Sequence, residues 1–144
     1  MSNSLRTIGD YELFIYGLPD QFKSIRKSTV ILIRLGASLG RVAGELYFDH
    51  GFRAVIRERI LFDRLPGVID WYGYEVSRGD EKLFWYDSQP HPDDAQLQAS
   101  HPHHKHVPPD IKHHRVPATQ MNFTRPNLPV LIEEIETLVS GIGE

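Results

Sequence analysis

The segment at residues 84–115 is rich in histidine and proline, and it sets the strongest limit on the fold. Seven of the eight histidines lie between His91 and His114, and six of the ten prolines lie between Pro90 and Pro117. Proline fixes φ and has no amide donor, so the segment should form neither an interior helix nor a central strand. Histidine changes its charge near neutral pH, and crowding several charged rings costs stability. We therefore predict a stiff, irregular arm with a functional role.

The rest of the chain alternates in the way that β-strands do. Its 144 residues suit one domain with a single core. Period-two patterns predict an antiparallel meander of about five strands, with a first strand at residues 29–35 that is buried on both faces. The predicted parts of the domain are an N-terminal helix and turn (10–28), the sheet (29–87), the arm (88–126) and a C-terminal helix (127–142).

Two helices are predicted from caps and spacing. Asp10 could cap a short helix over Tyr11 to Tyr16, and Asn127 could cap a longer one from Leu128 to about Ser140. The second has an apolar stripe at helical spacing, which predicts that it packs on the sheet. The predicted fold class is therefore α+β, an antiparallel meander packed on a C-terminal helix.

Composition excludes several classes of site. The chain has no cysteine, so disulfides, thiolate zinc sites and cysteine nucleophiles are ruled out. No apolar run approaches about 18 residues and no secretion signal is visible, so we expect a cytoplasmic protein without a membrane partner. The net charge of −3 argues only mildly against a nucleic-acid partner, because local charge can differ from the total.

One strand carries a stripe of arginines. Arg53, Arg57 and Arg59 project to a single face, and Arg41 from the neighbouring strand could join them. Such a stripe can follow phosphates. Four aromatic side chains could stack on the bases of single-stranded RNA: Tyr72, Tyr74, Trp85 and Tyr86. The alternatives are a solvated face paired with glutamates, and aromatic rings that simply fill the core.

The histidines suggest acid–base chemistry. Cleavage of an RNA phosphodiester needs a base, an acid and a cation, and it requires no metal and no cofactor, so we expect none. We predict His104 and His106 as acid and base, with Lys105 and Arg57 holding phosphate. Further predicted catalytic residues are His103, Tyr86 and Asp87, and Arg115 is a further predicted contact to RNA.

A metal site is the alternative reading of the same histidines. The pattern His-x-His-His-x-His at residues 101–106 has Lys105 where metallo-β-lactamase-like hydrolases need an aspartate. A simpler site with two or three imidazoles remains open, because alternate residues of an extended chain point the same way.

The stretch from Tyr72 to Pro108 resembles the TumE-type family of bacterial toxins. The resemblance is carried by Tyr72 and Tyr74, by Tyr86 and Asp87, by His91 and by Pro-His-His-Lys-His at residues 102–106. It implies a cognate helix-turn-helix antitoxin and a target in translation, RNA or the ribosome, by analogy with RelE-like ribonucleases. We therefore expect the toxin of a type II toxin–antitoxin pair that cuts RNA. The alternatives are a non-enzymatic binding domain and a metal-dependent hydrolase.

Overall fold

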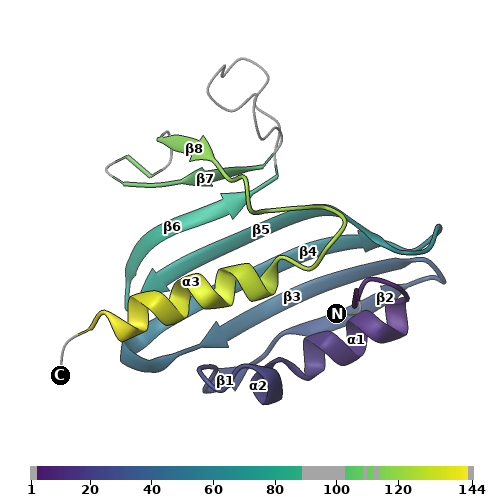
Figure 1. Ribbon diagram of the computed structural model, residues 1–144, viewed down its shortest axis with the longest axis horizontal. Helices are drawn as coiled ribbons and strands as arrows, with labels where there is room; N and C mark the ends of the chain where they lie inside the picture. Colours follow the sequence, from purple (N-terminus) through teal and green to yellow (C-terminus); the bar gives the residue numbers. More distant parts are fainter. Residues whose placement is uncertain (1–2, 89–102, 109, 112–113, 143–144) are drawn as a thin grey trace.

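The computed structural model describes residues 3–88, 103–108, 110–111 and 114–142 of the chain. The described elements are α1 (Ile8–Tyr16), α2 (Leu18–Gln21), β1 (Lys27–Ser28), β2 (Ile31–Leu35), β3 (Leu39–Tyr47), η1 (Asp49–Gly51), β4 (Phe52–Leu61), β5 (Val68–Arg78), β6 (Glu81–Asp87), β7 (His104–His106), β8 (Arg115–Pro117) and α3 (Leu128–Ser140). Together they form the predicted α+β domain, an antiparallel sheet with a C-terminal helix (Figure 1).

The sheet has more strands than the five that were predicted. It has eight strands in the order β1-β3-β4-β5-β6-β7-β8, with β2 also paired to β3. Of the three added strands, β1 precedes the predicted sheet, whereas β7 and β8 come from the arm, and β7 has a strand on each side (Figure 1). The prediction that the arm forms no central strand is therefore wrong. Proline forbids a long strand here, but β7 is short enough to contain no proline.

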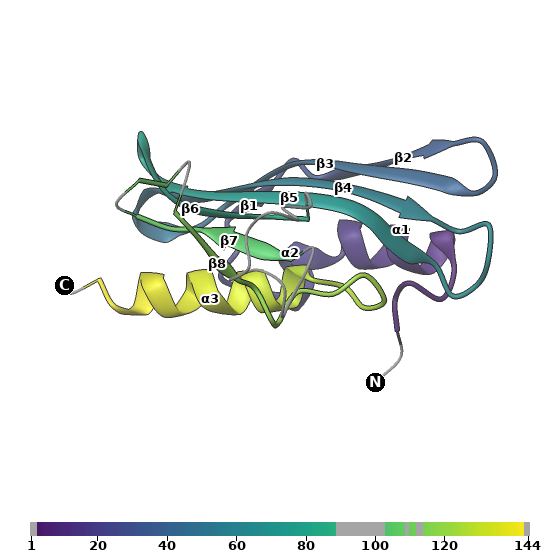
Figure 2. The ribbon, with the colours of Figure 1, turned by 90° about the horizontal axis from the view of Figure 1, so that it is seen from above.

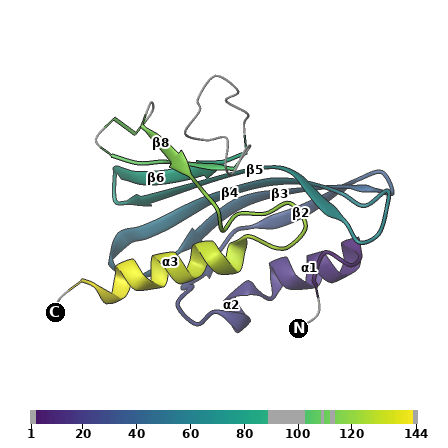
Figure 3. The ribbon, with the colours of Figure 1, turned by 45° about the horizontal axis from the view of Figure 1, so that its top comes forward.

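The described helices all lie on one face of the sheet (Figure 2). The predicted C-terminal helix is confirmed as α3, and its stripe is buried against that face. The buried members of the stripe are Leu128, Leu131, Ile132 and Ile135. The chain passes from β8 back over the sheet to reach α3 (Figure 3). No described helix is long and apolar enough to cross a membrane.

Both predicted helix caps need correction. The first helix begins at Ile8, not after Asp10, and its N-cap is Thr7. The hydroxyl of Thr7 accepts a hydrogen bond from the backbone amide of Asp10 at 3.1 Å. Asn127 precedes α3 as predicted, but its side chain makes no capping bond to that helix. Its amide instead donates to the carbonyl of Asn122 at 2.9 Å and to the hydroxyl of Tyr74 at 3.2 Å.

Strand β2 lies at an edge and is not buried on both faces as predicted. Its pairing is with β3. Leu32 points into the core, whereas Ile31, Ile33 and Leu35 have exposed fractions of 45%, 43% and 44%. The apolar run misled the prediction because apolar residues on both sides of a strand do not require two covered faces.

Glu58, the one polar residue on the inner face of β4, lies in the core. It accepts hydrogen bonds from the hydroxyls of Tyr11 on α1 and Tyr74 on β5, both at 2.5 Å. Burial raises the pKa of this carboxyl, while the two tyrosine bonds act to lower it. Because Asn127 also bonds the hydroxyl of Tyr74, a hydrogen-bond network centred on Glu58 and Tyr74 joins α1, β4, β5 and the residue before α3.

Candidate functional site

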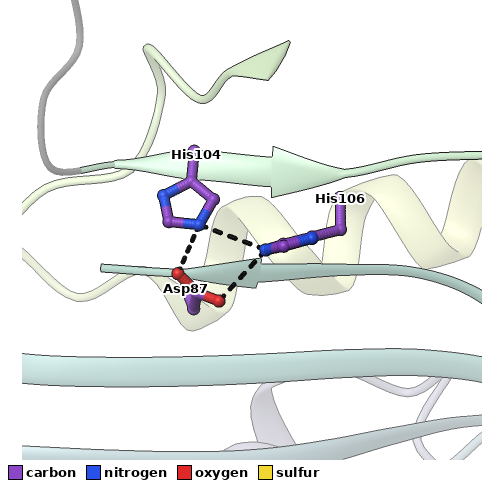
Figure 4. Close-up of side chains that lie close together, drawn as sticks. All are labelled: Asp87, His104 and His106. Carbon is purple, nitrogen blue, oxygen red and sulfur yellow. Dashed lines mark hydrogen bonds and ion pairs between the residues drawn. The ribbon is translucent and has the colours of Figure 1, made fainter. Parts of the chain in front are cut away.

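Three of the predicted catalytic residues meet on the face of the sheet that no described helix covers. Strands β6 and β7 are antiparallel neighbours, with Asp87 opposite His104 and Trp85 opposite His106. Side chains alternate between the faces of a strand, so these four point to the same side. We call Asp87, His104 and His106 the imidazole–carboxylate cluster (Figure 4).

The atoms of the cluster lie within bonding distance of one another. The Nε2 atom of His104 is 2.5 Å from Oδ1 of Asp87, and the Nε2 atom of His106 is 3.3 Å from Oδ2. The two Nε2 atoms are 3.2 Å apart. The histidines are 1% and 5% exposed, although their face carries no described helix. The three side chains therefore converge on one point between β6 and β7.

Neighbouring groups orient the cluster. The Nδ1 atom of His106 lies 3.0 Å from the carbonyl oxygen of Ile111, in the loop after β7. A carbonyl can only accept, so Nδ1 carries the hydrogen and a neutral ring keeps a lone pair on Nε2. The indole of Trp85 stacks on His106 with ring centres 4.1 Å apart, and its Nε1 donates to Oδ2 of Asp87 at 3.2 Å.

Burial is the main influence on the pKa of His106, which it lowers. The nearby His104 ring lowers it further, while Asp87 and the Ile111 carbonyl raise it. Desolvation wins because a charged ring loses more than a neutral ring when water is removed. The environment thus favours a neutral ring whose Nε2 lone pair faces Asp87 and His104.

The other three predicted catalytic residues point to the helix face. Lys105 alternates with its two histidine neighbours, and its Nζ atom lies 2.7 Å from Oε2 of Glu134 on α3. The hydroxyl of Tyr86 donates to Oε1 of the same glutamate at 2.7 Å. His103 bonds the hydroxyl of Tyr72 at 2.7 Å. The three fasten β7 to the core and to α3, and they lie on the opposite side of the sheet from the cluster.

The predicted stacking by Tyr72 and Tyr74 does not fit their positions. Both rings are 0% exposed, and they stack on each other with centres 5.0 Å apart. The prediction failed because both tyrosines point to the inner face of β5, where amphipathic rings fill the core.

The predicted arginines lie on the same open face as the cluster. Arg57 and Arg59 on β4 are exposed, and Arg41 on β3 stands directly opposite Arg59. Some of their charge is matched: Nε of Arg59 lies 2.6 Å from Asp70. Arg53 makes a longer pair with Glu45 at 3.8 Å, as the alternative reading of a glutamate-paired face expected. On β8, Arg115 is opposite His106.

One row of the sheet joins the arginines to the cluster. Across the strands, Arg57 is opposite Gly73, Gly73 is opposite Asp87, and Asp87 is opposite His104. Two strand spacings correspond to about 10 Å between the backbones of Arg57 and Asp87. Gly73 has no side chain to fill that interval. A Cβ built on it would lie 3.4 Å from the ring of Trp71, the 38% exposed indole that borders the row.

Sequence reasoning missed several parts of this site. Gly73 and the carbonyl of Ile111 carry no signal of their own, and only the strand register reveals them. Trp85 was expected only as a stacking surface. The predicted metal ligand His101 lies outside the described residues.

Comparison with known protein families identifies the family of this chain. The chain matches the family described as Toxin TumE over residues 19–139, which include every residue of the cluster and of the arginine stripe. No curated protein and no solved structure matches the chain significantly. The family match covers most of the chain, and the chain therefore belongs to the TumE toxin family.

Proposed function

We propose that this toxin inhibits growth by cutting RNA on the open face of the sheet. The observation that supports this most is the row in which Arg57, Gly73, Asp87 and His104 follow one another on neighbouring strands. A bound phosphodiester could contact positive charge at one end of the row and the cluster at the other. The indole of Trp71 lies beside Gly73 in this row and would face the bound nucleic acid.

The residues in this row suit phosphodiester cleavage. The reaction needs a group that takes a proton from the attacking oxygen, a group that returns one to the leaving oxygen, and positive charge beside the phosphate. The cluster supplies the first two functions, directly or through a bound ion. Arg57 and Arg41 supply the charge, in place of the Lys105 expected from the sequence. Trp71 is the exposed aromatic ring that a base could stack on.

The partners in this proposal follow from family membership. A toxin requires a neutralising antitoxin, and we propose the helix-turn-helix protein of a type II pair. The target is RNA, free or on the ribosome. The identity of the neighbouring gene tests the first part, since an unrelated metabolic gene there would count against the pairing.

Induced expression without the antitoxin tests the cleavage. The wild type should stop growth and shorten cellular transcripts, as read by primer extension. The double variant His104→Ala/His106→Ala should cut at least about a hundredfold more slowly, because loss of positioned proton-transfer groups costs that much or more. The matched control is His50→Asn, which removes an imidazole on η1 and keeps a residue that tolerates its φ of 62°.

The non-enzymatic alternative has one observation in its favour, the exposed cationic face itself. A toxin that only occupied an RNA or protein site would still stop growth in the histidine double variant, with transcripts intact. It would instead fail in Arg41→Ala/Arg57→Ala. Growth arrest by the histidine variant, once its fold is verified by circular dichroism, would therefore reject cleavage and support binding.

A further inference from the structure

We infer that Asp87, His104 and His106 together bind one first-row transition-metal ion, for which zinc fits the donor set best. The three side chains offer two imidazole nitrogens and a carboxylate oxygen. Two histidines with one carboxylate are a known ligand set for catalytic zinc, which keeps its remaining position for water or substrate. The inference replaces the sequence-based expectation of a metal-free site.

The spacing of the donor atoms fits a single ion. Ligands of tetrahedral zinc lie about 2.0–2.2 Å from the metal, so neighbouring ligands are roughly 3.3 Å apart. The two Nε2 atoms are 3.2 Å apart, and the carboxylate oxygens lie 2.5 and 3.3 Å from them. The candidate ligand atoms all lie within 4.8 Å of one another. The 2.5 Å contact between His104 and Asp87 is shorter than the spacing of two zinc ligands, so these two groups would move apart by less than about 1 Å on binding the ion.

The direction of the lone pairs supports the same conclusion. Because Nδ1 of His106 donates to the carbonyl of Ile111, its Nε2 faces the cluster as an acceptor when the ring is neutral. A metal-bound imidazole usually donates its other nitrogen to a carbonyl or carboxylate in this way. Trp85 likewise donates to Asp87 and sets the carboxylate's orientation. Each of these two ligands thus has a partner that holds it in place.

The local charge is suitable for a cation. Lys105, the residue that argued against a metal in the sequence, points to the other face and pairs with Glu134. Asp87 brings a negative charge, and its side chain is 19% exposed, whereas those of His104 and His106 are 1% and 6% exposed. An ion would therefore be reached from the carboxylate side, toward Gly73 and Arg57.

Metal binding does not require RNA, so the inference stands apart from the proposed function. It deepens that function only in the role of the ion in cleavage, and this role rests on RNA being the substrate. A bound zinc ion would supply a polarised water and positive charge beside the phosphate. The ligand set can be tested in the free protein.

The test uses full-length protein, purified from its antitoxin complex without a histidine tag and treated with a chelator. Calorimetric titration with zinc chloride should show one ion per chain. Cobalt chloride should give the visible absorption of a tetrahedral site. His104→Ala, His106→Ala and Asp87→Asn should each weaken zinc binding at least tenfold. His50→Asn and His114→Ala, which remove imidazoles outside the cluster, should leave the affinity unchanged.

Each outcome decides the inference. Absence of stoichiometric binding, or binding that survives His104→Ala/His106→Ala, would overturn it. Asp87→Asn keeps the size of the side chain, so it remains informative where an alanine variant fails to fold. Zinc binding by a protein that leaves transcripts intact would support the inference and reject the proposed function. Cleavage that requires the histidines but persists in chelator, with no zinc bound, would do the reverse.

Discussion

Glu58 is a carboxyl group enclosed by apolar side chains, and its titration should be visible in the stability of the protein. Burial raises its pKa, so the folded state holds the proton more tightly than the unfolded state does. The contribution of Glu58 to stability is therefore greatest below the ordinary glutamate pKa of about 4.3 and falls as the pH rises toward the folded pKa.

The variant Glu58→Gln removes this titration. We expect the free energy of unfolding of the wild type, minus that of Glu58→Gln, to decrease as the pH rises from about 4. Urea unfolding over a pH series measures the difference. A difference that stayed constant over that range would show that the carboxyl ionises equally easily in both states.

Gly44 provides a second test at this scale. Its φ is +147°, and an added Cβ would lie 2.4 Å from Cα of Val30, where the chain crosses between β1 and β2. Gly44→Ala should therefore cost far more stability than Gly36→Ala. Gly36 also has a positive φ, +72°, but open space around it, so its cost is about 1–2 kcal/mol. Equal shifts of the urea midpoint would contradict the proposed crowding.

The alternation of side chains along a strand explains which residues of the site could be predicted from the sequence. The sequence assigned His104, His106 and Asp87 to one catalytic site, and the structure places their side chains together, while their catalytic role stays a prediction. Applied consistently, the same alternation places Lys105 on the opposite face from the two histidines. The prediction assumed that residues adjacent in the chain point to the same site. On a strand, a residue between two others points to the opposite face from both of them.

Among the secondary structure elements, β7 connects the site to the core. Its outward side chains form the cluster, and Lys105 binds Glu134 of α3 on the inner side. The variant Lys105→Met keeps an apolar stem beside the ring of Phe84 and removes the ion pair. We expect a loss of about 1 kcal/mol, because the pair is partly solvated, with growth arrest largely kept. Loss of toxicity equal to that of His104→Ala would restore the phosphate role that the sequence suggested.

Helix α3 should account for much of the core energy. Ile135 is fully buried between the helix and the sheet, and Ile135→Ala should cost about 2–5 kcal/mol through the cavity it leaves. The control on the same helix is Glu133→Ala, at an exposed position, with an expected effect within about 0.5 kcal/mol. Thermal unfolding of both variants checks the contrast, and equal losses would place α3 outside the core.

Long periodic elements were predictable, and short ones were not. The helix over 128–140 was recognised because its apolar stripe repeats over several turns. Strands β7 and β8 have three residues each, too few for a period, and their positions depend on pairing with β6 and with each other. The proline content argued correctly against long elements but could not indicate such short ones.

At the scale of the whole molecule, the sheet has a closed face and an open one. The closed face carries the described helices (Figure 2). The strand register places the arginines and the cluster on the open face. The sequence predicted the helix face from the apolar stripe. Which residues of distant strands share a row depends on the register of every pairing between them, and no local pattern determines that.

This division predicts a salt-dependent interaction with RNA. Replacing Arg57 by alanine should weaken binding of single-stranded RNA and reduce the slope of log affinity against log salt by about 0.7, the value for one phosphate contact. Arg6→Ala serves as the control, because Arg6 pairs with Asp10 beside α1. Fluorescence anisotropy over a salt series measures both. Equal slopes in the two variants would remove Arg57 from the interface.

The carboxyl of Glu58 connects parts of the chain that are synthesised at very different times. Its phenol partners come from the first helix and the fifth strand, and Asn127 joins them only just before the last helix. A nascent chain that ends before Asn127 has the first two partners but not the third, and it lacks the helix that closes the core over them. Enclosure of this carboxyl therefore requires that residues 127–140, which include α3, have already been synthesised.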